Sequence, residues 1–487
     1  MNVIDSKPYE MLIGGRWQAG REGLAFDTLN PATAKPLAQV HQAHATDVDA
    51  AVQAAHAAFE NGWGRTTPAE RGRLLRRLAV LFERDREKLA WIETLNVGKP
   101  ITHSRESLKA MPSSLEYFAG MIAAVRGETI AVGNSDVLNY TIREPLGVCA
   151  LIMPWNYPMT LTINKLGPAL AAGNTIVLKP SEVTPLSTLA LARLFEEAGF
   201  PPGVVNVVNG PGATVGEQLV THPLVSRVSF TGGTVTGARI LATTAGELKR
   251  VTLELGGKSP LIVFDDASLD KAVAVAAGDI IKNSGQVCIA CTRILVQETV
   301  HDDFLDRLQQ RLKTVRVGAP EAVGTEMGPL VSAAQKQRVE QYIQIATEEG
   351  ARPACFGELV QDQSTASGFF VPPTLLLQSS AQMQSAQDEI FGPVQSVIRF
   401  RDEDDALRIA NHSRYGLAAV VFTRDGGRAL RMARGLQAGS VAINTGVRTS
   451  FDAPFGGYKL SGIGKERGLE AIYENTQLKN VKYDMSV

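Results

Sequence analysis

The chain has 487 residues, 44% of them apolar, and its 49 basic side chains nearly balance 50 acidic ones. This balance argues against nucleic acid or a charged membrane surface as a partner, and no apolar run approaches the roughly 20 residues that cross a bilayer. The length predicts two or three domains in a soluble protein. Four cysteines are too few for a disulfide scaffold and the N-terminus carries no secretion signal, so we expect a reducing, cytoplasmic location.

The first well-marked element is an amphipathic helix that begins at Thr67. Threonine, proline and then glutamate at position 70 form a capping-box signature, and leucines recur on one face after it. From about residue 147, short apolar runs alternate with helix-length segments such as 185–199. This rhythm predicts a parallel, doubly wound sheet, which binds ligands at the carboxyl ends of its strands. The runs are GVCALIM, TIVLKP, VVNVVNG, RVSFTGG, VTLELGG and PLIVFDD.

A second α/β stretch follows from about 258 to 456 and opens with an apolar helix near 267–282. Two further segments, 136–144 and 477–483, alternate polar and apolar residues as half-buried strands do. Neither segment belongs to the parallel pattern. We therefore expect them at a sheet edge or a contact between subunits.

The glycine fingerprint G-x-G-x-x-G, which usually cradles a dinucleotide phosphate, does not follow the first strand. A near miss at 210–216 has proline where backbone N–H groups are needed. Gly232 and Gly233 in FTGGTVTG are better placed, because they end a strand and open a helix whose N-terminus attracts anions. A bare strand-to-helix turn is the alternative interpretation.

Lys179 and Glu182 follow the strand TIVLKP, where a nucleotide site usually contacts ribose. A carboxylate accepts hydrogen bonds from ribose hydroxyls and repels a 2′-phosphate. The pair therefore favours NAD, with NADP as the alternative because of the lysine. Two solvated surface charges would produce the same pattern.

Cys288 and Cys291 lie in SGQVCIACTR with the spacing of a redox pair or half a zinc site. A zinc site would need two more ligands, and no histidine or further cysteine lies nearby. The pattern thus favours one nucleophile after a small, flexible tripeptide. Asn156 in PWNYP is a candidate oxyanion donor, and Glu254, which ends an apolar strand, is a candidate general base. Each residue has an equally simple structural interpretation when taken alone.

Together these motifs resemble the aldehyde dehydrogenase superfamily from about residue 12 to 483. The matching segments are PWNYP, LKPSE, EAGFPPGVVNVV, FTGG, ELGGKSP, GQVC, EIFGPV and PFGGYKLSGIG. The resemblance implies a Rossmann-like doubly wound NAD-binding domain (1–123 and 146–256) and an α/β catalytic domain (257–456). It also implies a small β oligomerisation domain (124–145 and 470–487), and hence a homodimer or homotetramer.

The resemblance also implies a reaction. Cys288 attacks an aldehyde to give a thiohemiacetal, whose oxyanion is held by Asn156 and the Cys288 N–H. Hydride passes to NAD, and the thioester left behind is hydrolysed by water that Glu254 activates. Glu466 matches an acid sometimes implicated in proton movement. The residues implied for cofactor binding are Trp155, Lys179, Glu182, Gly232, Gly233, Leu255, Glu389 and Phe391, and no metal is implied.

Two positions depart from the family pattern. The family usually has serine in place of Gly233, and Thr234 is a candidate substitute. Asn164 stands where many members carry an aromatic residue, which argues against a quaternary ammonium substrate. It equally argues against the arginine that succinate-type semialdehyde enzymes place there. We expect a mostly apolar substrate tunnel and a medium-sized aliphatic or aromatic aldehyde; the tunnel residues implied are Met159, Leu161, Asn164, Ile289 and Phe455.

Two alternative functions remain at this stage. A CoA-acylating relative would release the acyl group to CoA, but such relatives generally lack the glutamate found here at 254. A catalytically silent binding or structural relative would not need Cys288, Glu254, Asn156 and Glu389 intact. Cys291 is interpreted as a packed thiol, with the further hypothesis that it protects Cys288 by forming a disulfide under oxidation.

Overall fold

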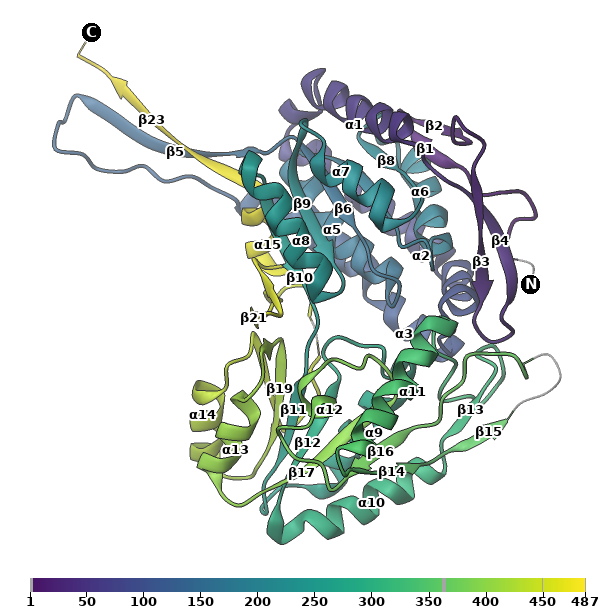
Figure 1. The fold of residues 1–487 in the computed structure, drawn as a ribbon. Coiled ribbons are helices and arrows are strands. Elements are labelled where there is room, and N and C mark those ends of the chain that lie inside the picture. The colour runs from purple at the N-terminus through teal and green to yellow at the C-terminus, as the bar shows by residue number, and fades with distance from the viewer. Residues whose placement is uncertain (1–2, 361–364, 449, 487) are drawn as a thin grey trace.

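The computed structural model describes residues 3–360, 365–448 and 450–486. Two lobes, each built on one large sheet, lie one above the other in Figure 1, and a long hairpin projects from the upper lobe. The chain crosses between the lobes through the connection from β10 to β11 and returns through its C-terminal segment, where β22 joins the upper sheet.

The upper sheet has the strand order β2-β1-β8-β7-β6-β9-β10-β22. Its five central strands, β8 to β10, are parallel, and their order reverses between β6 and β9. This is the predicted doubly wound arrangement, with antiparallel strands added at both edges. The bounds are β1 (Met11–Ile13), β2 (Arg16–Gln18), β6 (Val148–Ile152), β7 (Thr175–Lys179), β8 (Val205–Val207), β9 (Val225–Thr231), β10 (Arg250–Glu254) and β22 (Gly462–Ile463).

The strand β6 shows why the sheet is covered on both faces. Val148 and Ala150 point into one apolar cluster, whereas Cys149 and Leu151 point into another, as the two-residue period of a strand requires. The first cluster contains α1 (Ala45–Glu60), α7 (Glu217–Thr221) and α8 (Thr234–Thr244). The second contains α2 (Pro68–Val97), α3 (Ile101–Lys109), α4 (Met111–Met121), α5 (Pro158–Ala172) and α6 (Leu186–Ala198).

Three predicted helices are confirmed. The helix predicted from Thr67 is α2, and its capping box is present: the Glu70 N–H donates to Thr67 Oγ1 at 3.3 Å and the Thr67 N–H to Glu70 Oε2 at 2.7 Å. The segment 185–199 forms α6, and 267–282 forms α9 (Leu269–Ile281).

The lower sheet has the order β14-β16-β17-β12-β11-β19-β20, parallel except for β14. Helices α9 and α10 (His301–Lys313) cover one face, and α13 (Glu403–Asn411) and α14 (Gly426–Gly435) the other. Strand β20 forms one edge. The strands are β11 (Ser259–Val263), β12 (Cys291–Gln297), β14 (Arg352–Cys355), β16 (Thr374–Leu377), β17 (Val394–Phe400), β19 (Ala418–Phe422) and β20 (Ser440–Ile443). Two more helices are α11 (Ala333–Glu348) and α12 (Gln384–Gln387).

The projecting hairpin pairs β5 (Val137–Pro145) with β23 (Thr476–Asp484) in antiparallel register over nine residues each. Both strands were predicted, and both lie outside the two large sheets (Figure 1). The short helix α15 (Gly468–Glu474) leads into β23. The predicted domain boundaries remain a prediction. No helix in the described residues is long and apolar enough to cross a membrane.

Further small elements complete the chain. Near the N-terminus, β3 (Ala25–Asn30) pairs with β4 (Lys35–His41). In the lower lobe β13 (Arg316–Gly318) pairs with β15 (Glu358–Val360), and β18 (Tyr415–Gly416) with β21 (Tyr458–Lys459).

Candidate functional site

The candidate site begins at the carboxyl edge of the upper sheet. Lys179 ends β7, Thr231 ends β9 and Glu254 ends β10, and the parallel register places Thr231 directly beside Glu254. The polar residues predicted from strand ends therefore share one edge. From there residues 255–258 cross to β11 of the lower sheet.

This crossing brings Cys288 toward Glu254. A Cβ added to Gly257 would lie 2.6 Å from the Cys288 carbonyl oxygen, so the crossing segment runs directly against the cysteine loop. Electrostatic interaction between the Cys288 thiol and the Glu254 carboxyl follows from this approach. Two motifs that are separate in the sequence thus form one site.

The loop before Cys288 has an unusual backbone. Asn283, Ser284 and Gly285 all adopt left-handed φ values, of 49°, 55° and 71°. Side chains other than glycine reach this region at a cost, so surrounding contacts must hold the loop. Ser284 Oγ donates to the Gly328 carbonyl at 2.7 Å, and a Cβ at Gly285 would collide with the Gly392 carbonyl. The loop is therefore built to present Cys288 in one orientation.

Asn156 contacts this loop from the upper lobe. Its side-chain Nδ2 donates to the Gln286 carbonyl at 3.0 Å, and Asn283 Nδ2 donates back to the Asn156 carbonyl at 3.1 Å. Asn156 is buried. The Asn156 amide, which is predicted as an oxyanion donor, is thus bonded to Gln286, the loop residue two positions before Cys288.

Glu254 is a buried carboxyl without a hydrogen-bond partner for either oxygen among the described residues. Burial, and then the nearby Glu466 carboxylate, raise its pKa well above the usual value. Glu466 itself forms a buried ion pair with Lys165. An unpaired carboxyl with a raised pKa is what a general base for water requires.

Cys288 is half-buried, and its thiol pKa is raised to about 12 by burial and by the carboxyls of Glu389 and Glu254. The Arg467 guanidinium acts in the opposite direction. Cys291 is fully buried, its N–H donates to Asp279 Oδ2 at 2.9 Å, and burial holds its pKa well above normal. The packed-thiol interpretation of Cys291 agrees with this burial, and its protective role stays a prediction.

Of the residues predicted to bind the cofactor, Glu389 interacts electrostatically with the Cys288 thiol. Glu389 Oε1 accepts the Gly257 N–H at 3.0 Å, and burial raises its pKa to about 7. Phe391 packs edge-on against Trp155 with ring centroids 5.1 Å apart. Leu255, the residue after Glu254, is buried. The Leu255 side chain packs against α8, where a Cβ added to Gly237 would lie 2.5 Å from it.

The remaining predicted cofactor residues lie at the ends of β7 and β9. Lys179 is buried, and its Nζ donates to Glu182 Oε2 at 3.1 Å, which lowers the Glu182 pKa despite partial burial. The Gly212 N–H donates to Glu182 Oε1 at 3.3 Å. The segment 210–216, which nearly matches the glycine fingerprint, therefore contacts this pair.

The turn after β9 is open. Gly233 begins α8 as its N-cap, and a Cβ there would meet nothing within 4 Å. Thr234, the first residue of α8, has a buried hydroxyl without a described partner. A hydroxyl without a partner at a helix N-terminus, where the dipole favours anions, keeps Thr234 a candidate replacement for the missing serine.

The residues predicted to line a substrate tunnel differ in burial. Met159 is fully buried in the apolar cluster under α5, Leu161 and Ile289 are half-buried, and Phe455 is buried. Asn164 is buried and accepts hydrogen bonds from a guanidinium, that of Arg467. Arg467 was not among the residues predicted to line the tunnel. Arg467 directly follows Glu466 in GKERG, but nothing local shows where its side chain points.

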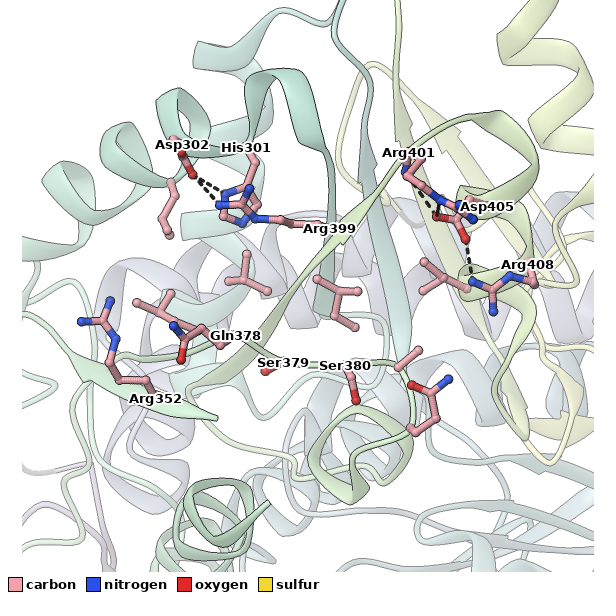
Figure 2. Close-up of a pocket in the computed structure, with 17 residues that line it drawn as sticks. His301, Asp302, Arg352, Gln378, Ser379, Ser380, Arg399, Arg401, Asp405 and Arg408 are labelled. Atoms are coloured by element: carbon pink, nitrogen blue, oxygen red, sulfur yellow. Dashed lines mark hydrogen bonds and ion pairs between the residues drawn. The ribbon is translucent and has the colours of Figure 1, made fainter. Parts of the chain in front are cut away.

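A separate cavity of about 730 Å³ lies in the lower lobe, and none of the residues above line it. In Figure 2, Arg399 and His301 contact Asp302, and Arg401 and Arg408 contact Asp405, whereas no ion pair is drawn to Arg352. The cavity therefore has a basic lining, and it contains none of the residues predicted for the reaction.

The fold and site define a cysteine-dependent enzyme with a doubly wound dinucleotide sheet. The aldehyde dehydrogenase family model matches residues 17–481, and the chain belongs to that family. An Aspergillus niger aldehyde dehydrogenase is 45% identical and a cytosolic aldehyde dehydrogenase 1 of Rattus norvegicus is 43% identical; the matches cover 98% of this chain and 95% of each relative. A betaine aldehyde dehydrogenase of Staphylococcus aureus, solved with NAD+ and a modified cysteine, superposes with TM-score 0.96 at 38% identity, over 98% of both chains.

Proposed function

We propose that the protein oxidises an aldehyde to the carboxylic acid with NAD as the oxidant. The observation that carries the proposal is the meeting of Cys288, Asn156 and Glu254, which come from three distant segments and two lobes. Each supplies one part of acyl transfer: a nucleophile, an oxyanion donor and a base.

The chain's own groups perform the covalent steps. The Cys288 sulfur attacks the carbonyl carbon, its proton passes to solvent water, and the Asn156 amide and the Cys288 N–H hold the oxyanion. Bound NAD would supply the hydride acceptor, and its positively charged ring would favour the thiolate. Glu254 then takes a proton from water, which attacks the resulting thioester and releases the acid and the thiol.

Several contacts support NAD at this site. The backbone N–H groups of the open turn at Gly233 and the Thr234 hydroxyl are candidate donors to a pyrophosphate. The Glu389 carboxylate is a candidate acceptor for the hydroxyls of the nicotinamide ribose. Glu182 retains one acceptor face toward ribose and repels a 2′-phosphate. Lys179 is already bonded to Glu182, so we propose NAD as the main cofactor and NADP as a weaker alternative.

Hydrolysis is favoured over acyl transfer to CoA. The Glu254 carboxyl is intact, unpaired and of raised pKa, which suits activation of water. A relative without catalytic activity would have no need of Asn156 and Glu254 next to a loop that holds Cys288 in one conformation.

We also propose a homo-oligomer in the cytoplasm. The hairpin of β5 and β23 projects from the molecule and exposes Leu138, Ile142 and Tyr483 (Figure 1). We propose that this hairpin, with residues 124–145 and 470–487, is the oligomerisation domain, while 1–123 with 146–256 binds NAD and 257–456 is catalytic. All four cysteines are free, and a relative is named cytosolic, which supports a reducing compartment.

The test is a substitution of the nucleophile. Cys288→Ala should form no NADH from an aldehyde in a single turnover, whereas Cys355→Ala, which changes an exposed cysteine, should behave as the wild type. Stopped-flow absorbance of NADH measures both. NADH formation by Cys288→Ala would show that the nucleophile is assigned wrongly.

A further inference from the structure

Arg467 has an unusually defined position. Its backbone is left-handed, with φ of 64°, and only 8% of the residue is exposed. The residue before it is fixed by two backbone hydrogen bonds, from the Phe455 N–H to the Glu466 carbonyl at 2.6 Å and back at 2.7 Å. Such a conformation persists in a non-glycine residue only where surrounding contacts impose it.

Among the described residues, the hydrogen bonds and the ring contact of the Arg467 side chain are with neutral groups. Its Nε and Nη2 donate to Asn164 Oδ1 at 3.1 and 2.9 Å, in the amide orientation that satisfies both residues. Its guanidinium also lies 5.2 Å from the Phe455 ring centroid. In the part of the chain that the structure describes, no carboxylate forms an ion pair with it. The Glu466 and Glu254 carboxylates act on it electrostatically, but Glu466 is already paired with Lys165.

This unpaired guanidinium stands at the reaction centre. It interacts electrostatically with Cys288 and Glu254, and the two residues that it contacts, Asn164 and Phe455, are those predicted to line the substrate tunnel. Burying a cation without an ion pair is costly, so a ligand that brings a carboxylate to this guanidinium would be stabilised by it.

We propose that Arg467, oriented by Asn164, binds the carboxylate of the substrate, so that the preferred substrates are oxo acids, which carry an aldehyde at one end and a carboxylate at the other. This inference rests on the proposed aldehyde oxidation. The aldehyde carbon meets the Cys288 sulfur, and the chain passes Phe455. Guanidinium nitrogens then donate to the carboxylate, a geometry that arginine favours.

The proposal replaces the expectation of a neutral aliphatic or aromatic substrate. That expectation relied on Asn164, which carries no charge, and on the apolar residues predicted to line the rest of the tunnel. In the structure Asn164 instead bonds to the guanidinium of Arg467, which lies 303 residues later in the chain. The neighbouring residues Lys165 and Glu466 form an ion pair across a similar separation of 301 residues.

The experiment compares matched aldehydes. 4-Oxobutanoate and 5-oxopentanoate are each paired with the neutral butanal and pentanal, and kcat/KM is measured with NAD for the wild type, Arg467→Met and Arg250→Met. Arg250 is an exposed arginine at the far end of the strand that carries Glu254, so its variant removes a charge without touching the tunnel.

We expect the wild type and Arg250→Met to favour at least one oxo acid over its neutral partner by about tenfold to a hundredfold, the usual worth of hydrogen bonds to a charged group. In Arg467→Met this ratio should collapse, mainly through KM for the oxo acid. Succinate should inhibit the wild type competitively against the aldehyde and inhibit Arg467→Met less.

Three results would overturn the inference or its basis. A wild type that prefers neutral aldehydes, and is not inhibited by succinate, would contradict the carboxylate site even if Arg467→Met fails to fold. If Arg467→Met lowers kcat/KM equally for the oxo acid and the neutral aldehyde of each pair, Arg467 is a positioning residue for Cys288 and does not bind a carboxylate. No NADH from any aldehyde would instead refute the proposed function itself.

Discussion

The proposed role of Glu254 as a general base can be tested directly. It lies at the end of β10 with both oxygens unpartnered among the described residues, and its pKa is raised by burial and by Glu466. It serves the second half of the proposed reaction, the attack of water on the thioester. Hydride transfer precedes that step and does not need this carboxylate.

Glu254→Gln should therefore show a burst of NADH followed by slow turnover. The steady rate should fall by about a hundredfold or more, the usual contribution of a general base. Rapid-mixing absorbance and intact-mass detection of the acyl-enzyme measure the two phases. Loss of the burst together with no acyl-enzyme would contradict the assigned order of steps.

Glu389 makes the protein's stability depend on pH. Burial raises its pKa in the folded state to about 7, against 4.5 for an unperturbed glutamate. The folded state therefore binds the proton more tightly, and this contribution to stability is present below pH 4.5 and is lost as pH rises toward about 7.

Glu389→Gln keeps the acceptor for Gly257 but cannot ionise. Without cofactor, its free energy of unfolding relative to the wild type should increase between pH 5 and pH 8 by on the order of 1–3 kcal/mol. Urea unfolding at both pH values measures the difference, with the exposed Glu298→Gln as control. A parallel pH dependence of wild type and Glu389→Gln would refute this account.

At the scale of elements, sequence patterns predicted what is local. The alternation of strand and helix, the capping box at Thr67 and the strand-end positions of Lys179 and Glu254 all depend on residues close in the chain. The two-residue strand β22 does not: it has no periodicity and exists because it pairs with Leu253 and Glu254. Arg467 escaped prediction for the same reason, since its hydrogen bond to Asn164 depends on tertiary packing.

The helix α2 also supports the site through a buried ion pair. Glu93 and Lys99 are both fully enclosed, Glu93 Oε2 accepts the Met159 N–H at 3.3 Å, and Lys99 Nζ lies 4.0 Å from the Tyr157 ring centroid. The pair thus holds the end of the loop that carries Asn156.

Lys99→Met should destabilise the protein by about 3–5 kcal/mol, because it leaves the Glu93 carboxylate buried without its partner. The double variant Glu93→Gln with Lys99→Met removes both charges and should recover much of that loss. Chemical unfolding of the four proteins in the cycle measures the coupling. Equal, additive losses in the cycle would show that the pair does not act as a unit.

At the scale of the whole molecule, the hairpin has one apolar face. Leu138, Tyr140 and Ile142 alternate on β5, and the register places Tyr483 opposite Leu138 and Val481 opposite Tyr140. The apolar stretch ends at Lys479, which lies opposite Ile142 and pairs with Glu144. A two-stranded ribbon is marginally stable alone, so an uncovered apolar face on a projecting arm calls for a partner. A second copy of the chain also offers the open edge of β20, whose residues are half-buried.

Tyr483→Lys should therefore shift the protein toward smaller assemblies. The substitution places a charge on the apolar face, where 60% of the tyrosine is exposed in the single chain, and burying that charge in a contact between copies is unfavourable. Asn480→Lys adds the same charge to the opposite face of the same strand and should leave the assembly unchanged. Light scattering after size-exclusion chromatography, over a tenfold range of concentration, distinguishes the two. If both variants keep the mass of the wild type, the apolar face does not hold copies together; if the wild type is itself monomeric, the proposed oligomer is wrong.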